Sequence, residues 1–115
     1  EIIYLKRRII KFYILGTYSE ESFEAFVNNP DQDRKAVVNA LSSAMGASFS
    51  DIEFLRGPYD FIVTLEADSF ETVAAVKMAV EAQGVGTVDI FETVDINAIA
   101  KKAGKALSNY SPPSS

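Results

Sequence analysis

Apolar residues recur along the chain with two different periods, one typical of strands and one typical of helices. Four segments are rich in β-formers and largely alternate between two faces, which predicts strands over residues 9–18, 48–56, 61–66 and 87–94. Three others have apolar residues three and four positions apart, which predicts amphipathic helices over residues 30–45, 69–83 and 96–107. The predicted order is therefore strand, helix, strand, strand, helix, strand, helix.

Capping residues mark where the predicted helices begin. Asn29 suits the N-cap, and Pro30 suits the first helical position, where its missing N–H leaves no intrahelical bond unmade. Residues 68–71 (Asp-Ser-Phe-Glu) form a capping box, and Asp95 caps the last helix. Residues 19–27 are expected to form a connector with one short helical turn.

This order predicts an α+β fold: a ferredoxin-like βαββαβ sandwich, with helices on one face of four antiparallel strands and an extra C-terminal helix. Residues 57–60 (Gly-Pro-Tyr-Asp) form the tight turn of the central hairpin. By length the chain holds one domain. We expect residues 1–8 to be an N-terminal extension, 9–107 the ferredoxin-like domain, and 108–115, rich in Ser and Pro, a disordered tail.

Both faces of the predicted sheet are apolar, yet two helices cover only one of them. The other face would present the side chains of Tyr13, Leu15, Ile62, Thr64 and Phe91. A monomer rarely leaves such a patch in water. Burying ~500 Å² per subunit at about 25 cal/mol per Å² would contribute on the order of 12 kcal/mol before costs.

We therefore predict a homodimer that pairs these faces as a dimeric α+β barrel, with higher assembly left open. In the alternative, the C-terminal helix or the N-terminal residues fold back over the sheet of the same chain. A single helix covers less than four strands, which favours the dimer.

Composition narrows the chemistry. The 115 residues include no His and no Cys, so the commonest general base and metal ligands are missing and we expect no metal and no cofactor. The net charge of -5 disfavours nucleic acid as a partner, and no apolar run reaches the roughly 20 residues of a membrane span. The basic residues 6–8 follow the apolar residues 2–5 instead of preceding them, so we expect no secretory signal and a cytoplasmic location.

The hairpin turn and the strand after it resemble a known family. Residues 57–63 (Gly-Pro-Tyr-Asp-Phe-Ile-Val) are similar to the signature of the GYD domain family, small proteins named for a Gly, a Tyr and an Asp in this turn. The surrounding elements agree over about residues 11–103, although the connector after the first strand lacks the glycine usual in the family. The resemblance implies a dimeric α+β barrel and, because the family is broadly uncharacterised, no particular reaction.

Five residues are candidates for binding a small ligand: Tyr13, Arg56, Tyr59, Asp60 and Glu66. Tyr59 and Asp60 would place a phenol and a carboxylate at the mouth of a cleft. Gly, Pro and Asp are also what a tight turn demands, and we favour this structural interpretation. Glu66 in an apolar cleft would have a raised pKa and would act as a base. At a strand end it would instead lie in water or pair with Arg56 across the dimer, which we favour.

The sequence thus predicts a small cytoplasmic homo-oligomeric domain that binds a small ligand or serves assembly. The expected partner is a second copy of the chain. The alternative is a metal-free enzyme of the dimeric α+β barrel type, similar to monooxygenases or lyases, and it rests on analogy of fold alone. A closed apolar pocket that holds a carboxylate or a tyrosine would favour the enzyme, whereas a pocket filled by side chains would favour assembly.

Overall fold

A computed structural model describes residues 8–113 as an α+β domain followed by one helix. Its elements are β1 (Ile10–Tyr18), α1 (Glu20–Asn28), α2 (Arg34–Ala44), β2 (Ser48–Phe54), β3 (Phe61–Ala67), α3 (Phe70–Ala82), β4 (Gly86–Glu92) and α4 (Ile96–Ser108). Residues 1–7, most of the predicted N-terminal extension, and residues 114–115 of the predicted tail lie outside the described part of the chain.

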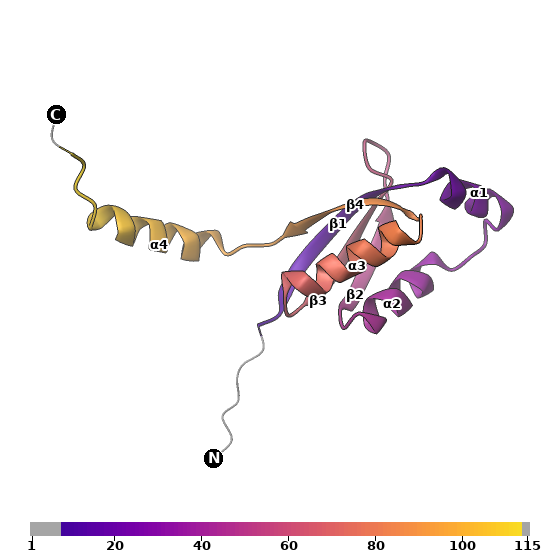
Figure 1. Ribbon diagram of the computed structural model, residues 1–115, viewed down its shortest axis with the longest axis horizontal. Coiled ribbons are helices and arrows are strands. Elements are labelled where there is room, and N and C mark those ends of the chain that lie inside the picture. Colours follow the sequence, from indigo (N-terminus) through magenta and orange to yellow (C-terminus); the bar gives the residue numbers. More distant parts are fainter. Residues whose placement is uncertain (1–7, 114–115) are drawn as a thin grey trace, which may run out of the picture.

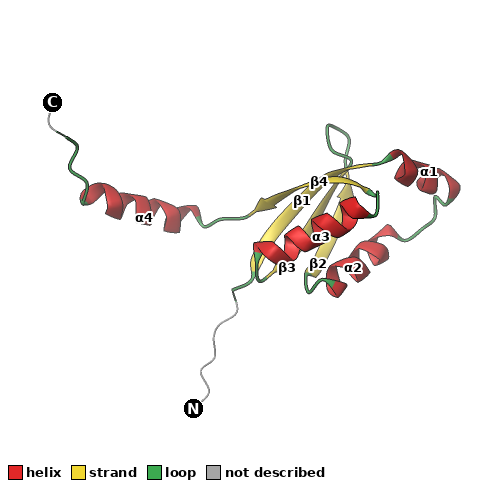
Figure 2. Cartoon of the chain, in the orientation of Figure 1, coloured by secondary structure: helices red, strands yellow, loops and turns green. Residues whose placement is uncertain are grey.

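The four strands form one antiparallel sheet in the order β2-β3-β1-β4. The central strand β1 pairs with β3 and β4, so that Ile14 lies opposite both Val63 and Ile90. Helices α2 and α3 lie on one face of the sheet (Figures 1 and 2). The ferredoxin-like prediction is therefore confirmed, and β2 and β4 are the edge strands.

The core lies between this sheet face and the two helices. Alternate residues of β1 and β3 supply most of it, since successive side chains of a strand point to opposite faces. Phe12, Leu65 and Val73 are fully buried. The other buried apolar side chains are Ile14, Ala47, Ile52, Phe61, Val63, Ala67, Val76 and Val88.

Helix α1 is longer than the single turn predicted for the connector. Its N-cap is Ser19, whose side chain accepts a hydrogen bond from the backbone N–H of Ser22. Its aromatic side packs onto the end of β1, where the ring of Tyr18 lies 4.7 Å from that of Phe26 and 4.6 Å from that of Phe61. Capping and aromatic packing together stabilise nine residues of helix that periodicity alone did not reveal.

The predicted start of α2 was wrong by about one turn. Asn29 is the C-cap of α1, and Asp33 is the N-cap of α2. Pro30 lies in the turn between the two helices, which Arg34 closes by donating hydrogen bonds to the carbonyls of Asn29, Pro30 and Gln32. Asn-Pro is typical of turns as well as of helix starts, and here the turn prevails because a second capping residue follows.

The other two caps lie at or next to their predicted positions. Ser69, not Asp68, is the N-cap of α3, and its hydroxyl accepts a hydrogen bond from the backbone N–H of Thr72. The Asp68 carboxylate instead accepts a hydrogen bond from the Thr72 hydroxyl. Asp95 caps α4 as predicted.

Helix α4 does not fold back over the sheet of its own chain. It extends away from the domain beyond the end of β4 (Figure 1), and none of its residues is buried. The alternative in which the C-terminal helix covers the second sheet face is therefore excluded for the described residues.

We expect Gly86→Ala to destabilise the sheet. A Cβ at this position would lie 2.0 Å from the carbonyl oxygen of Thr17, a backbone atom that the β1–β4 ladder holds in place. The free energy of unfolding should fall by about 1–3 kcal/mol, measured by urea unfolding followed by circular dichroism. Gly104→Ala is the matched control because a Cβ there meets open space. Equal unfolding midpoints for the two variants would contradict the expected clash.

Candidate functional site

The Gly-Pro-Tyr-Asp turn joins β2 to β3 and projects beyond the sheet (Figure 1). Gly57 has a φ of +153°, a region that side chains disfavour. Asp60 accepts a hydrogen bond from the backbone N–H of Tyr18 at 2.9 Å, and its own N–H donates to the carbonyl of Gly16 at 2.8 Å. These two bonds fasten the turn to the end of β1.

Tyr59 reaches from this turn to β4. Its hydroxyl donates a hydrogen bond to Asp89 at 2.9 Å, and this bond raises the pKa of the tyrosine. Asp60 and Tyr59 therefore act as links between strands in this structure, which agrees with the structural interpretation that we favoured from the sequence.

The five sequence-predicted ligand residues do not meet at one place. Tyr13 and Glu66 lie on the sheet face that no helix covers, and Arg56 lies exposed in the hairpin turn. The cation of Lys11 lies 5.2 Å from the centre of the Tyr13 ring. Together with Tyr59 and Asp60 they are spread over the uncovered face and its end, so they do not surround a common cavity.

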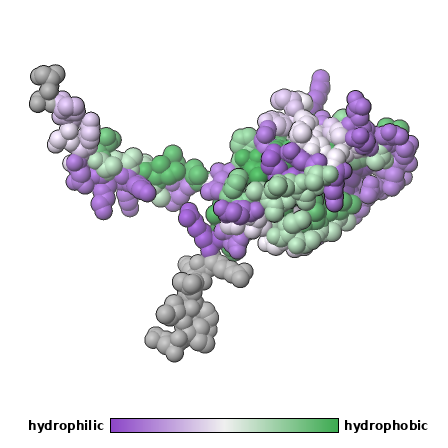
Figure 3. All heavy atoms as spheres, in the orientation of Figure 1, coloured by the Kyte–Doolittle hydropathy of each residue, from purple (hydrophilic) through white to green (hydrophobic). Residues whose placement is uncertain are grey.

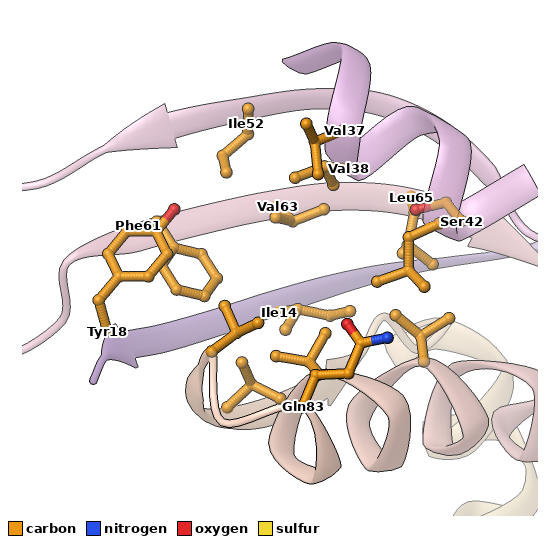
Figure 4. Close-up of a pocket in the computed structure, with 15 residues that line it drawn as sticks. Ile14, Tyr18, Val37, Val38, Ser42, Ile52, Phe61, Val63, Leu65 and Gln83 are labelled. Atoms are coloured by element: carbon orange, nitrogen blue, oxygen red, sulfur yellow. The ribbon is translucent and has the colours of Figure 1, made fainter. Parts of the chain in front are cut away.

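A cavity of about 170 Å³ lies on the opposite, helix-covered face (Figure 4). We call it the helix-side cavity. It exists because α2 packs mainly against β2 while α3 packs mainly against β4, which leaves a space between the two helices above the central strands. It is lined by Ile14, Tyr18, Val37, Val38, Leu41, Ser42, Ile52, Phe61, Val63, Leu65, Val76, Val80, Gln83, Val85 and Val88.

Three of the lining residues carry polar groups. Ser42 of α2 is 1% exposed, and its hydroxyl has no hydrogen-bond partner among residues 8–113. Gln83 lies across the cavity at the end of α3, with its amide directed inward (Figure 4). The pKa of Tyr18 is raised to about 12, mainly because the phenol is buried. The positive charge of Arg34 lowers this pKa and the negative charge of Asp60 raises it, both by less than burial does. The Tyr18 phenol is therefore protonated at neutral pH.

Sequence reasoning missed Ser42 and Gln83. The signal for Ser42 was present, because it lies four residues after Val38 and one after Leu41, within the apolar stripe of α2. A buried polar side chain at a core position of a helix normally has a hydrogen-bond partner, which is a protein group, a water molecule or a ligand. Gln83 gave no such signal, since it is the last residue of the predicted helix over residues 69–83, where a polar residue is ordinary.

The second sheet face is uncovered, as the strand pattern predicted. We call it the open sheet face; at its centre are Tyr13, Leu15, Ile62, Thr64 and Phe91. Phe91 is 48% exposed, and the other four are half-buried by their neighbours. Around this centre lie four carboxylates, those of Asp51, Glu53, Glu66 and Asp89.

Within residues 8–113, no three His, Cys, Asp or Glu side chains lie close enough together to hold a metal ion. No helix in that part of the chain has the length and apolar character needed to cross a bilayer.

The family model described as GYD domain matches residues 12–103, most of the chain. The chain belongs to the GYD domain family. The match spans the whole sheet, its helices and the first half of α4. Comparisons with curated proteins and with solved structures found no match. Membership fixes the family without supplying a reaction.

In this GYD domain, Asp60→Ala should lower the stability more than any change to the neighbouring tyrosine. Removal of the carboxylate leaves the N–H of Tyr18 without its acceptor, which costs about 1–3 kcal/mol when the donor is shielded from water. Asp60→Asn keeps an acceptor oxygen and should cost less. Tyr59→Phe removes an exposed bond and should change the stability by at most about 0.5 kcal/mol. Urea unfolding of the three variants tests this order, and a Tyr59→Phe loss as large as that of Asp60→Ala would contradict it.

Proposed function

We propose that this domain binds a small, uncharged and mainly apolar molecule in the helix-side cavity. The observation that carries the proposal is the hydroxyl of Ser42, which is buried beside an apolar space without a hydrogen-bond partner. An unpaired buried hydroxyl costs free energy, and a ligand with one polar atom would restore the missing bond.

The lining defines the class of ligand. It contains no Asp, Glu, Lys or Arg, so a charged ligand would lose its hydration without meeting an opposite charge. The volume of about 170 Å³ suits a molecule with one ring, since a cavity of roughly 150 Å³ accepts benzene. Ser42 and Gln83 would bind a hydroxyl or a carbonyl group on that ring.

Binding is favoured over catalysis by the same lining. Tyr18 is its one ionisable side chain, and a pKa of about 12 leaves the phenol as a hydrogen-bond donor at neutral pH. A general base for an enzyme would need a pKa near the working pH. The alternative of a small-molecule enzyme therefore lacks a base among the residues that line the cavity.

We expect benzyl alcohol and cyclohexanone to shift the amide resonances of residues around the cavity, whereas benzoate and benzylammonium should not. Ser42→Ala removes the hydroxyl and leaves the rest of the side chain unchanged. It should weaken benzyl alcohol about two- to tenfold, the range of one net hydrogen bond. Titrations followed by two-dimensional amide NMR give both the affinity and the place of binding.

Toluene is the matched control ligand because it lacks the hydroxyl of benzyl alcohol. Its affinity should stay the same or rise in Ser42→Ala. An equal loss for toluene and benzyl alcohol would mean that the variant distorts the cavity. Binding of the charged analogues at the same residues would contradict the proposed ligand class.

A second proposed function is self-assembly through the open sheet face. Its support is the half-buried apolar centre of that face, which no element within residues 8–113 covers. A second copy of the chain presents the same face and can bury it in a two-fold, sheet-to-sheet dimer. The family resemblance implies the same arrangement.

We expect light scattering at micromolar concentration to give twice the 12.6 kDa mass of one chain. Phe91→Glu places a charge in the centre of the open sheet face and should weaken self-association at least about tenfold. Met78→Glu is the matched control, because Met78 is 73% exposed on α3, away from this face. The mass of a single chain for the unaltered protein would rule out the dimer.

A further inference from the structure

Helix α4 has an apolar side that no other element within residues 8–113 covers. At about 100° per residue, Ile96, Ile99, Ala103 and Leu107 share one side of the helix. Ile96 is 67% exposed and Leu107 70%. Figure 3 shows hydrophilic and hydrophobic residues on different sides of this helix. An isolated helix of 13 residues is marginal in water, so α4 needs a surface to pack on.

The connection between β4 and α4 directs this helix away from its own sheet. The backbone N–H and the hydroxyl of Thr93 both donate to the carbonyl of Lys11, at 3.0 Å and 2.7 Å. Two residues later, Asp95 caps α4 with a bond to the N–H of Ala98. With these bonds in place, α4 extends away from the open sheet face of its own chain (Figure 1). A partner that receives α4 in this arrangement lies outside its own domain.

Exposed apolar residues recur between the open sheet face and α4. Phe91, Val94, Ile96 and Ile99 follow one another along the chain, and each is at least 48% exposed. A partner that covers the open sheet face from the β4 side would therefore also contact α4. In a sheet-to-sheet dimer that partner is the second copy.

Charge also favours a second copy as the partner of α4. Residues 12–94 carry fourteen Asp and Glu against four Lys and Arg, whereas α4 carries three Lys and no carboxylate. Pairing two such domains brings like charges together, including the carboxylates that surround the open sheet face. A basic helix from each copy placed against the other domain lowers this repulsion.

We propose that α4 is an exchanged arm: in the homodimer, each copy packs the apolar side of its α4 on the domain of the other copy. This inference rests on the proposed self-assembly. An anionic membrane is the competing partner for a basic amphipathic helix. The absence of Trp, Phe and Tyr from α4, and the location of Lys101 and Lys105 far from the apolar side, favour the second copy.

Ile99→Glu in the full chain tests the arm. Because α4 contributes nothing to the core of its own domain, the fold should persist while self-association weakens about tenfold, as expected for an anchoring interface residue. Ala98→Glu is the matched control, since it adds the same charge in the same turn but on the polar side of α4. Its self-association should stay within about twofold of the original. Analytical ultracentrifugation measures both.

Spin labelling shows which copy the arm contacts. The chain has no cysteine, so Lys105→Cys gives a single labelling site on the polar side of α4. In the first sample, chains that carry the spin label but no ¹⁵N are mixed with ¹⁵N-labelled chains of the original sequence. In the second sample, the spin label and ¹⁵N are in the same chain, which is diluted with an excess of unlabelled original protein. We expect the domain resonances to broaden more in the first sample than in the second. The reverse order would mean that α4 packs on its own domain and would overturn the proposal.

The remaining outcomes separate the arm from the dimer. A dimer that Ile99→Glu leaves intact overturns the exchanged arm and leaves self-assembly through the open sheet face in place. A single-chain mass for the original protein overturns both. Flotation with phosphatidylserine vesicles that Ile99→Glu abolishes, with self-association unchanged, assigns α4 to a membrane and overturns the arm.

Discussion

The central constraint on this protein is a sheet with two apolar faces in a chain that supplies helices for only one of them. In β1, Phe12 and Ile14 face the helices while Tyr13 and Leu15 face the other way. Such strands are typical of sheets covered on both sides. Within residues 8–113 the second cover is missing, because α4 leaves the domain instead of returning over it. We propose that a second copy of the chain supplies the missing cover of this face.

The first face is covered incompletely, and this has a different consequence. Helices α2 and α3 pack over the outer strands β2 and β4, so β1 and β3 form the floor of the helix-side cavity. A close-packed core would place side chains there. The proposal of a ligand there rests on Ser42, because its buried hydroxyl has no partner within residues 8–113. The two faces thus support two separate proposals, a ligand on one side and a second copy on the other.

Period and capping were enough to predict the fold but not the details of two helix starts. The four strands were predicted at the right places because apolar residues recur two positions apart, which fixes their face, although β2 and β4 end two residues earlier than predicted. Asn29 and Pro30 misled because the same dipeptide suits a turn, and the choice depended on Arg34, whose hydrogen bonds to the turn carbonyls cannot be seen in a sequence. Helix α1 depended likewise on the packing of Phe26 onto Tyr18.

The candidate site was less predictable than the fold, because a cavity is a property of helix placement. No local pattern says that α2 and α3 are separated over the central strands. The sequence directed attention to the charged and aromatic residues of the hairpin turn, which prove to be links between strands. Ser42 was the one detectable signal, a hydroxyl inside an apolar stripe.

The Gly-Tyr-Asp turn nevertheless connects the two faces. Asp60 holds the backbone of Tyr18, whose ring lines the helix-side cavity. Tyr59, the adjacent residue, holds Asp89 at the margin of the open sheet face. A ligand that moved Tyr18 and a second copy that moved Asp89 would act on adjacent residues of this turn. Any coupling between occupancy of the cavity and pairing of the sheets would be reciprocal, so that each would change the free energy of the other by the same amount.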